Sequence, residues 1–329
     1  MQKYSHSGKC PPAPVIASKK YRVIMDGDIA CEADDLYAVA YALMSDKLDI
    51  VGLCSEQWGT EWSDTSMEDG YQELLKLTEA MGVTGIPICR GAVNAIRKNE
   101  DGEYEYEMNE ASRLIIDEAL KEDDRPLVIG CTGTMTNVAI AYLACPEIAD
   151  KLYVVGNNLP HGAWDFNLGN DCNACNILMD SPVEWYLGKS KTGFTYKASM
   201  TRLYQELSKC GKVGDYLWQR TLYAQEQLTY RIGKDVERGF LGRGLSNFEL
   251  RDFVPNGEIF ELNDMEVVAR LLSMGYASFE MEDACHLLSI AGTLDPDYTP
   301  VRKVKCFANG TDVKTFMDDF FAKLNYYYG

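Results

Sequence analysis

The sequence contains few histidines and no long apolar run. Only three of its 329 residues are histidine, and no stretch reaches the roughly 18 consecutive apolar residues of a membrane helix. The first 20 residues also lack an apolar segment long enough for a secretion signal. These absences argue against a helical membrane protein and against a secreted one.

Positive charge is scarce as well. The chain has 32 Lys and Arg against 50 Asp and Glu, a formal net charge of −18, and no dense basic patch. Such a surface repels nucleic-acid backbones and anionic membranes. We therefore expect neither as a partner.

The cysteines do not form a disulfide pattern. They are eleven in number and scattered along the whole chain, which fits a reducing compartment, so the sequence predicts a cytoplasmic protein. Cys172 and Cys175 form a lone C-x-x-C motif. Because no second pair exists to complete a zinc site, we interpret these two cysteines as packing residues.

Apolar strand-like and helix-like segments alternate along the first half of the chain. Strands are predicted at 21–26, 48–56, 86–91, 126–133 and 152–158, and helices at 34–45, 66–82, 109–122 and 136–145. This alternation indicates a Rossmann-like α/β fold, with a mainly parallel central sheet, helices on both faces and a helical C-terminal part. We expect a single domain over residues 21–329, preceded by an N-terminal extension of residues 1–20.

An acidic loop joins the first predicted strand to the first predicted helix. It contains Asp26, Asp28, Glu32, Asp34 and Asp35. Acids at a helix start complement the helix dipole, but this does not account for the two that end the strand. A hard cation, calcium or magnesium, would remove the repulsion among them. A phosphatase with a D-x-D-x-T/V motif is an alternative, although the hydroxyl residue of that motif is absent here.

Five motifs in order along nearly the whole chain resemble the inosine-uridine preferring nucleoside hydrolase family. The first, DGDIACEADDLYAVAYAL, resembles the family's acidic signature in a variant with a longer loop. The others are IPICRGA, GCTGTMTNVAIAYLACPEIADKLYVV, WDFNLGNDCNACNIL and LNDMEVVARLL. The resemblance implies a hydrolase that cleaves a ribonucleoside, or a modified ribonucleoside, to ribose and free base with Ca²⁺ bound. It also implies a homodimer or homotetramer.

The resemblance assigns a metal site. Asp28, Asp35, Asp264 and the backbone carbonyl of Thr136 would bind the calcium ion, and Asp26 would orient these ligands from behind. Asp28 would also accept a proton from the attacking water. Carboxylates from distant parts of the chain suit an all-oxygen calcium site.

The resemblance also assigns the substrate contacts. The residues expected to bind ribose are Asp34, Asp165 and Asn167, with Asn158 or its neighbour Asn157 in addition. Trp58 and Trp164 lie on loops at the same edge and are candidates for stacking on the base, although tryptophans in α/β proteins more often pack in the core.

Three departures from the family pattern affect the leaving group and the sugar. The family's histidine before the late metal-binding Asp is Asn263 here, so His161 is the candidate general acid. The Gly-Asn after the second strand is replaced within SEQWGTEW, and a ribose-binding Glu is the shorter Asp165. A non-catalytic protein that binds a ribosyl ligand therefore remains an alternative, and the base is not specified.

Overall fold

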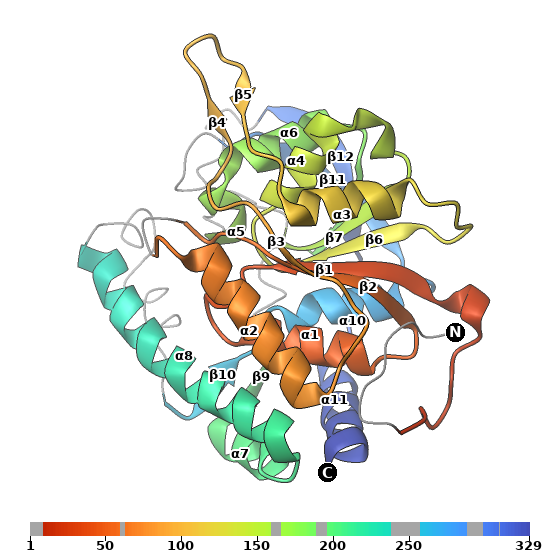
Figure 1. The fold of residues 1–329 in the computed structure, drawn as a ribbon, viewed down its shortest axis with the longest axis vertical. Helices are drawn as coiled ribbons and strands as arrows, with labels where there is room; N and C mark the ends of the chain where they lie inside the picture. The colour runs from red at the N-terminus through yellow and green to blue at the C-terminus, as the bar shows by residue number, and fades with distance from the viewer. Residues whose placement is uncertain are drawn as a thin grey trace.

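A computed structural model describes residues 9–59, 63–158, 166–188, 196–237, 257–287, 299–308 and 310–329. Its centre is an eight-stranded sheet in the order β11-β12-β8-β7-β6-β1-β2-β3 (Figure 1). Its strands are β1 (Tyr21–Gly27), β2 (Leu48–Ser55), β3 (Ile88–Arg90), β6 (Leu127–Cys131), β7 (Leu152–Asn158), β8 (Glu184–Gly188), β11 (Phe279–Cys285) and β12 (Pro300–Phe307). All neighbours pair in parallel except β11 and β12. The predicted, mainly parallel sheet is confirmed.

Helices cover both faces of this sheet, as Figure 1 shows. One face is covered by α3 (Glu110–Ala119), α4 (Thr136–Ala144) and α6 (Cys172–Asp180). The other face carries α1 (Asp34–Met44), α2 (Ser66–Met81), α10 (Met265–Ser273) and α11 (Val313–Tyr328), with α7 (Met200–Leu207) and α8 (Gly211–Glu237) packed outside them. Each face has its own apolar core.

Four short strands and three short helical segments complete the described structure. The strands pair as β4 (Arg97–Lys98) with β5 (Tyr104–Glu105), and β9 (Lys197–Ser199) with β10 (Ile259–Glu261). The helical segments are α5 (Phe166–Asn170) and the 3-10 turns Ala17–Lys19 and Pro146–Ile148.

Helix α1 is buried along its whole length. Every one of its residues is buried, because α2, α10 and α11 all pack against it. A helix in the core of a protein can be apolar on all sides, and the AVAYALM segment of α1 has this composition. The two acids at its start, Asp34 and Asp35, are therefore buried together with the rest of the helix.

The C-terminal part supplies strands as well as helices. β11 and β12 form an antiparallel hairpin, and β12 joins the parallel sheet beside β8. The sequence-based interpretation did not anticipate these strands. Lys303 and Lys305 alternate with apolar residues along β12 and form ion pairs with Asp283 and Glu184, so this segment has the two-residue period of a strand.

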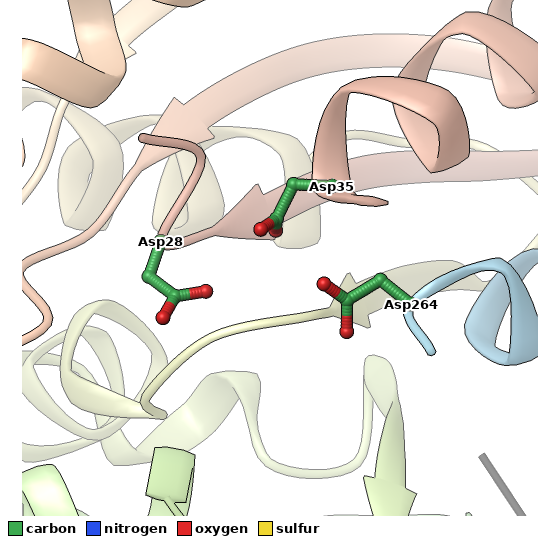
Figure 2. Close-up of side chains that lie close together, drawn as sticks. All are labelled: Asp28, Asp35 and Asp264. Carbon is green, nitrogen blue, oxygen red and sulfur yellow. The ribbon is translucent and has the colours of Figure 1, made fainter. Parts of the chain in front are cut away.

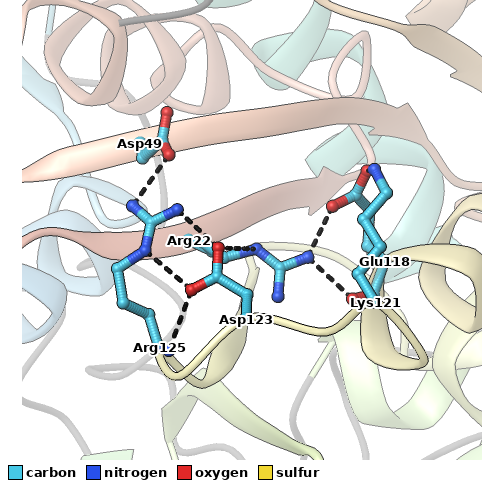
Figure 3. A network of polar contacts seen from close by, with 6 residues as sticks. All are labelled: Arg22, Asp49, Glu118, Lys121, Asp123 and Arg125. Carbon is cyan, nitrogen blue, oxygen red and sulfur yellow. Dashed lines mark hydrogen bonds and ion pairs between the residues drawn. The ribbon is translucent and has the colours of Figure 1, made fainter. Parts of the chain in front are cut away.

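Charged residues join the amino-terminal ends of the parallel strands (Figure 3). Arg22 on β1 donates to Glu118 at 2.6 Å, and Arg125 donates to Asp49 at 2.9 Å and to Asp123 at 2.7 Å. Hydrogen bonds from Arg125 are the main reason why the pKa of Asp123 is lowered. This network lies at the edge of the sheet opposite to the carboxyl ends, where ligands bind in folds of this type.

Within the described residues, no helix is both long enough and apolar enough to cross a lipid bilayer.

Candidate active site

Three buried carboxylates meet at the carboxyl end of β1. Asp28 follows β1, Asp35 lies in the first turn of α1 and Asp264 directly precedes α10. One carboxylate oxygen of each lies within 4.8 Å of the others, and Figure 2 shows the three side chains turned toward a common space. The structure thus brings together acids from distant parts of the chain. Their arrangement could hold a metal ion.

The side chains of Thr132 and Asp35 lie close to the backbone of Gly27, at the end of β1. The hydroxyl of Thr132, just after β6, donates to Asp35 at 2.6 Å. A Cβ atom at Gly27 would lie 2.2 Å from that hydroxyl and 2.5 Å from the Asp35 carboxylate. Any side chain in place of Gly27 would therefore displace the bond between Thr132 and Asp35.

Burial raises the pKa values of the acids. Burial, followed by the charges of Asp35, Asp34 and Glu32, raises the pKa of Asp28 well above its ordinary value. Burial likewise raises the pKa of Asp35 to about 7, although hydrogen bonds from Thr132 and Asp264 oppose the effect. Crowded carboxylates of this kind become stable as anions when a cation joins them.

Asp34 connects the two distant parts of the site. Its carboxylate accepts the backbone N–H of Asp264 at 3.3 Å, and burial followed by the charge of Asp35 raises its pKa to about 7. By the resemblance, Asn263 occupies the position of the family's histidine. Its buried amide oxygen has no hydrogen-bond partner among the described residues.

A polar layer, of which the sequence analysis indicated Asp26 but not Glu56, lies beneath the three acids. Asp26, which is fully buried, accepts the side-chain amide of Asn137 at 2.9 Å. Glu56, equally buried, accepts the backbone N–H of Asn137 at 3.1 Å and the hydroxyl of Thr134 at 3.1 Å. Burial and then the charge of Asp26 raise the pKa of Glu56 well above its ordinary value. The only available signal was an acid directly after an apolar strand.

Thr136 belongs to the same layer. Its hydroxyl donates to the Asp171 carboxylate at 2.8 Å and accepts a hydrogen bond from the Gln57 side-chain amide at 3.3 Å. It also lies 2.9 Å from the Thr134 hydroxyl. Asp171 also caps α6 by accepting the backbone N–H of Ala174. The layer thus joins the ends of β2 and β6 to the starts of α4 and α6.

Besides Asp34, two of the expected substrate residues can be located. The side chain of Asn167, in α5, donates to the Thr132 carbonyl at 2.7 Å, which places it beside the partner of Asp35. Trp58 is 7% exposed and therefore mostly covered by the protein. Asn158 ends β7, but its side chain lies outside the described residues, as do His161, Trp164 and Asp165.

Arg220 on α8 approaches the acidic loop from outside. Its guanidinium donates to the Glu32 carbonyl at 3.3 Å and lies 3.3 Å from the Glu73 carboxylate of α2. This contact attaches the acidic loop to two helices of the outer face.

Comparisons with known proteins identify relatives of this chain. The family model described as inosine-uridine preferring nucleoside hydrolase matches residues 23–282. The pyrimidine-specific ribonucleoside hydrolase RihA of Escherichia coli O1:K1 is 25% identical over 174 residues, which cover 46% of this chain and 54% of that protein. The chain thus aligns with about half the length of such curated relatives.

Solved structures share the fold over nearly the whole chain. The purine-preferring ribonucleoside hydrolase from Gardnerella vaginalis superposes with a TM-score of 0.67 at 19% identity, covering 93% of this chain and 98% of that one. The plant nucleoside hydrolase PpNRh1 gives 0.65 at 17% identity, with 93% and 99% covered. The effector protein XOO4466 gives 0.62 at 12% identity, with 97% and 95% covered.

Proposed function

Because the chain belongs to the inosine-uridine preferring nucleoside hydrolase family, we propose that it hydrolyses the N-glycosidic bond of a ribonucleoside, or a modified ribonucleoside, to ribose and free base. The observation that carries this proposal is the convergence of Asp28, Asp35 and Asp264 in a buried space. The residues that the family model matches, 23–282, include all three acids.

The acids suit a calcium ion. Three buried carboxylates with only oxygen donors match the preference of a hard cation, and the Thr136 carbonyl is the fourth proposed ligand. When bound, calcium would hold ribose hydroxyls and acidify a water molecule. The raised pKa values of Asp28 and Asp35 support this assignment, since both would be stable as anions beside such a charge.

The remaining residues have proposed roles in the reaction. Asp28 takes a proton from the attacking water, and Asp34 holds a ribose hydroxyl. Carboxylates around the sugar stabilise the positive charge that develops as the C–N bond breaks. Asp26 fixes the inner acids through its bond to Asn137.

Further proposed contacts lie around the sugar and the base. Asn158, Asp165 and Asn167 would contact the ribose. Trp58 and Trp164 would lie near the base, which His161 would protonate as it leaves.

The proposal is tested by release of reducing sugar from a broad panel of purine, pyrimidine and modified ribonucleosides. We expect turnover with calcium present, loss of turnover after chelation, and recovery when calcium is restored. Asp264→Asn should lack turnover, while Asp180→Asn, which changes an exposed carboxylate far from the site, should match the wild type.

Asn263 in place of the family histidine favours a second candidate, a non-catalytic protein that binds a ribosyl ligand. Calorimetric binding of a nucleoside without sugar release would support it. Phosphate release from phosphate esters would indicate a metal-dependent phosphatase instead. Either result would overturn the proposed hydrolase.

We also propose that the single domain of residues 21–329 assembles as a homodimer or homotetramer. Tyr204 on α7 and Leu222 and Tyr223 on α8 are 55%, 42% and 50% exposed, and a second copy would cover them. Sedimentation of a monomer at micromolar concentration would refute this assembly.

A further inference from the structure

A row of residues crosses four strands of the sheet at one level. Cys89 on β3 is in register with Cys54 on β2, Cys54 with Asp26 on β1, and Asp26 with Cys131 on β6. In-register neighbours in a sheet point to the same face. Two thiols therefore lie side by side at the β3 edge, and a third lies beyond Asp26.

The thiols of Cys54 and Cys89 interact directly. Their hydrogen bond is the first cause that lowers the pKa of Cys89 and raises the pKa of Cys54. Cys54 is fully buried, and the nearby acids Asp26 and Glu56 also oppose its ionisation, whereas Cys89 is half-buried. The pair thus has a half-buried thiol, Cys89, whose pKa is lowered, and a fully buried thiol, Cys54, in contact with it.

The third thiol of the row is not a competing partner. Cys131 is separated from Cys54 by β1, which places the two strands about 9.6 Å apart, or two strand spacings. The Cys131 thiol donates to the carbonyls of Gly133 and Thr134 at 3.4 and 3.2 Å. Cα atoms more than about 7 Å apart cannot be bridged without backbone movement.

The backbone allows a bond between Cys54 and Cys89. Adjacent strands are about 4.8 Å apart, within the 4.4–6.8 Å range of Cα separations for disulfides, although the Cβ atoms must approach by roughly 0.5–1 Å. β3 has only three residues and is an edge strand of the sheet, so it can make this adjustment. A disulfide formed under such strain is easily reduced.

We propose that Cys54 and Cys89 form a reversible oxidation site that responds to a peroxide. The Cys89 thiolate attacks one oxygen of hydrogen peroxide, so that an S–O bond forms, the O–O bond breaks and hydroxide leaves. The sulfur of Cys54 then attacks the sulfur of Cys89 as its proton is lost. The S–S bond forms, the S–O bond breaks, and the oxygen leaves as water. In sum, two thiols are oxidised and one peroxide is reduced to two waters.

The site is tested by peptide mapping of the full-length protein, in a Cys10→Ser background that removes an exposed thiol. After peroxide treatment and alkylation without reductant, trypsin should release peptides 48–76 and 77–90 joined by a disulfide. Each of these peptides contains one cysteine, Cys54 or Cys89. The joined species should weigh about 2 Da less than the separate peptides together, and dithiothreitol should separate them.

Variants in which one cysteine is replaced by serine distinguish a specific Cys54–Cys89 pair from nonspecific oxidation of cysteines. In Cys89→Ser, a change at the sheet edge, Cys54 should remain reduced. In Cys54→Ser, Cys89 should oxidise beyond the sulfenic acid without a linked peptide. Cys145→Ser is the matched control, because Cys145 is also half-buried, and it should leave the linked peptide unchanged.

Native-state alkylation gives an independent measurement. Burial is the first cause that raises the pKa of Cys145, whereas the pKa of Cys89 is lowered, so Cys89 should react faster than Cys145 at neutral pH. Equal rates would overturn the proposal. So would peroxide oxidation of Cys145 without a linked peptide, or oxidation of Cys54 that persists in Cys89→Ser.

Discussion

Adding calcium to the metal-free protein should stabilise it, and the gain should depend on pH. At a calcium concentration about 1,000 times the dissociation constant, binding contributes about 4 kcal/mol. A chain of 329 residues has an unfolding entropy of roughly 0.7 kcal/mol/K, so this gain raises Tm by about 6 °C.

The pKa of Asp35 sets the pH window of the effect. It rises from 3.8 to about 7 in the folded, metal-free protein. A carboxyl whose pKa is raised by folding destabilises the folded state. This cost is absent below pH 3.8 and fully present above about pH 7, where it amounts to about 4 kcal/mol. The metal-free protein should therefore lose stability as pH rises through this range.

At low pH the Asp35 carboxyl is protonated in the metal-free protein, so calcium must displace this proton in order to bind. From about pH 7.5 down to pH 5, the need to displace one proton weakens calcium binding about a hundredfold, so the gain in stability falls to about 1 kcal/mol and the rise in Tm to about 2 °C. Differential scanning calorimetry at both pH values, with calcium and with chelator, measures these gains.

Two variants test whether the stabilisation by calcium comes from the proposed metal site or from carboxylates on the surface. Asp35→Asn should lose most of the calcium gain and make the metal-free protein more stable near neutral pH, while Asp180→Asn should behave as wild type. An equal calcium gain at both pH values, or a full gain in Asp35→Asn, would refute the reasoning.

Three further predictions concern single side chains. Asp28→Asn should lower kcat by about 10²–10⁴ with little change in KM, because it removes the proton acceptor; steady-state kinetics with unchanged kcat would contradict this role. Burial raises the pKa values of both Glu56 and Asp26, and the hydrogen bond between their side chains lowers that of Asp26 and raises that of Glu56, so Glu56 is the donor. Glu56→Gln should keep wild-type stability, because an amide can donate to Asp26 as the protonated acid does, while Glu56→Ala should cost about 3 kcal/mol. Equal losses of the two variants in urea unfolding would show that Glu56 does not donate to Asp26. Arg22→Met should lower the free energy of unfolding by about 3 kcal/mol, the low end for a broken buried ion pair, because the buried Glu118 keeps only the half-exposed Lys121 as a partner. Lys303→Met, at an exposed pair, should cost less than about 1 kcal/mol, and similar losses in both variants would be the contrary result.

Most of the fold could be predicted from the sequence, because the patterns that indicate its strands and helices are local. Each parallel strand is a short apolar run followed by turn residues, and strands of this kind need only their neighbours to form a sheet. Asp28 and Asp35 could be placed at one edge because both flank the same strand-to-helix loop. Asp264 could be added only by resemblance, because no local pattern connects it to them.

Other features depended on tertiary structure. Whether Glu56 faces solvent or Asp26 depends on how α4 lies over the end of β2, and that is decided by packing rather than by the strand itself. β12 was obscured because its alternating lysines made it look like a charged tail. The pairing of those lysines with acids on neighbouring strands becomes visible only in the folded sheet.

The bond from the Asp264 N–H to Asp34 joins positions 230 residues apart, which has a consequence for the order of folding. Closing so long a loop costs entropy that shorter contacts such as the pairing of β1 with β2 do not require. The N-terminal strands can form while the chain is still being synthesised, but the acids of the loop remain without their last member until α10 docks. Completion of the site is thus a late folding event, and a cation that binds only the complete site selects chains that have finished folding.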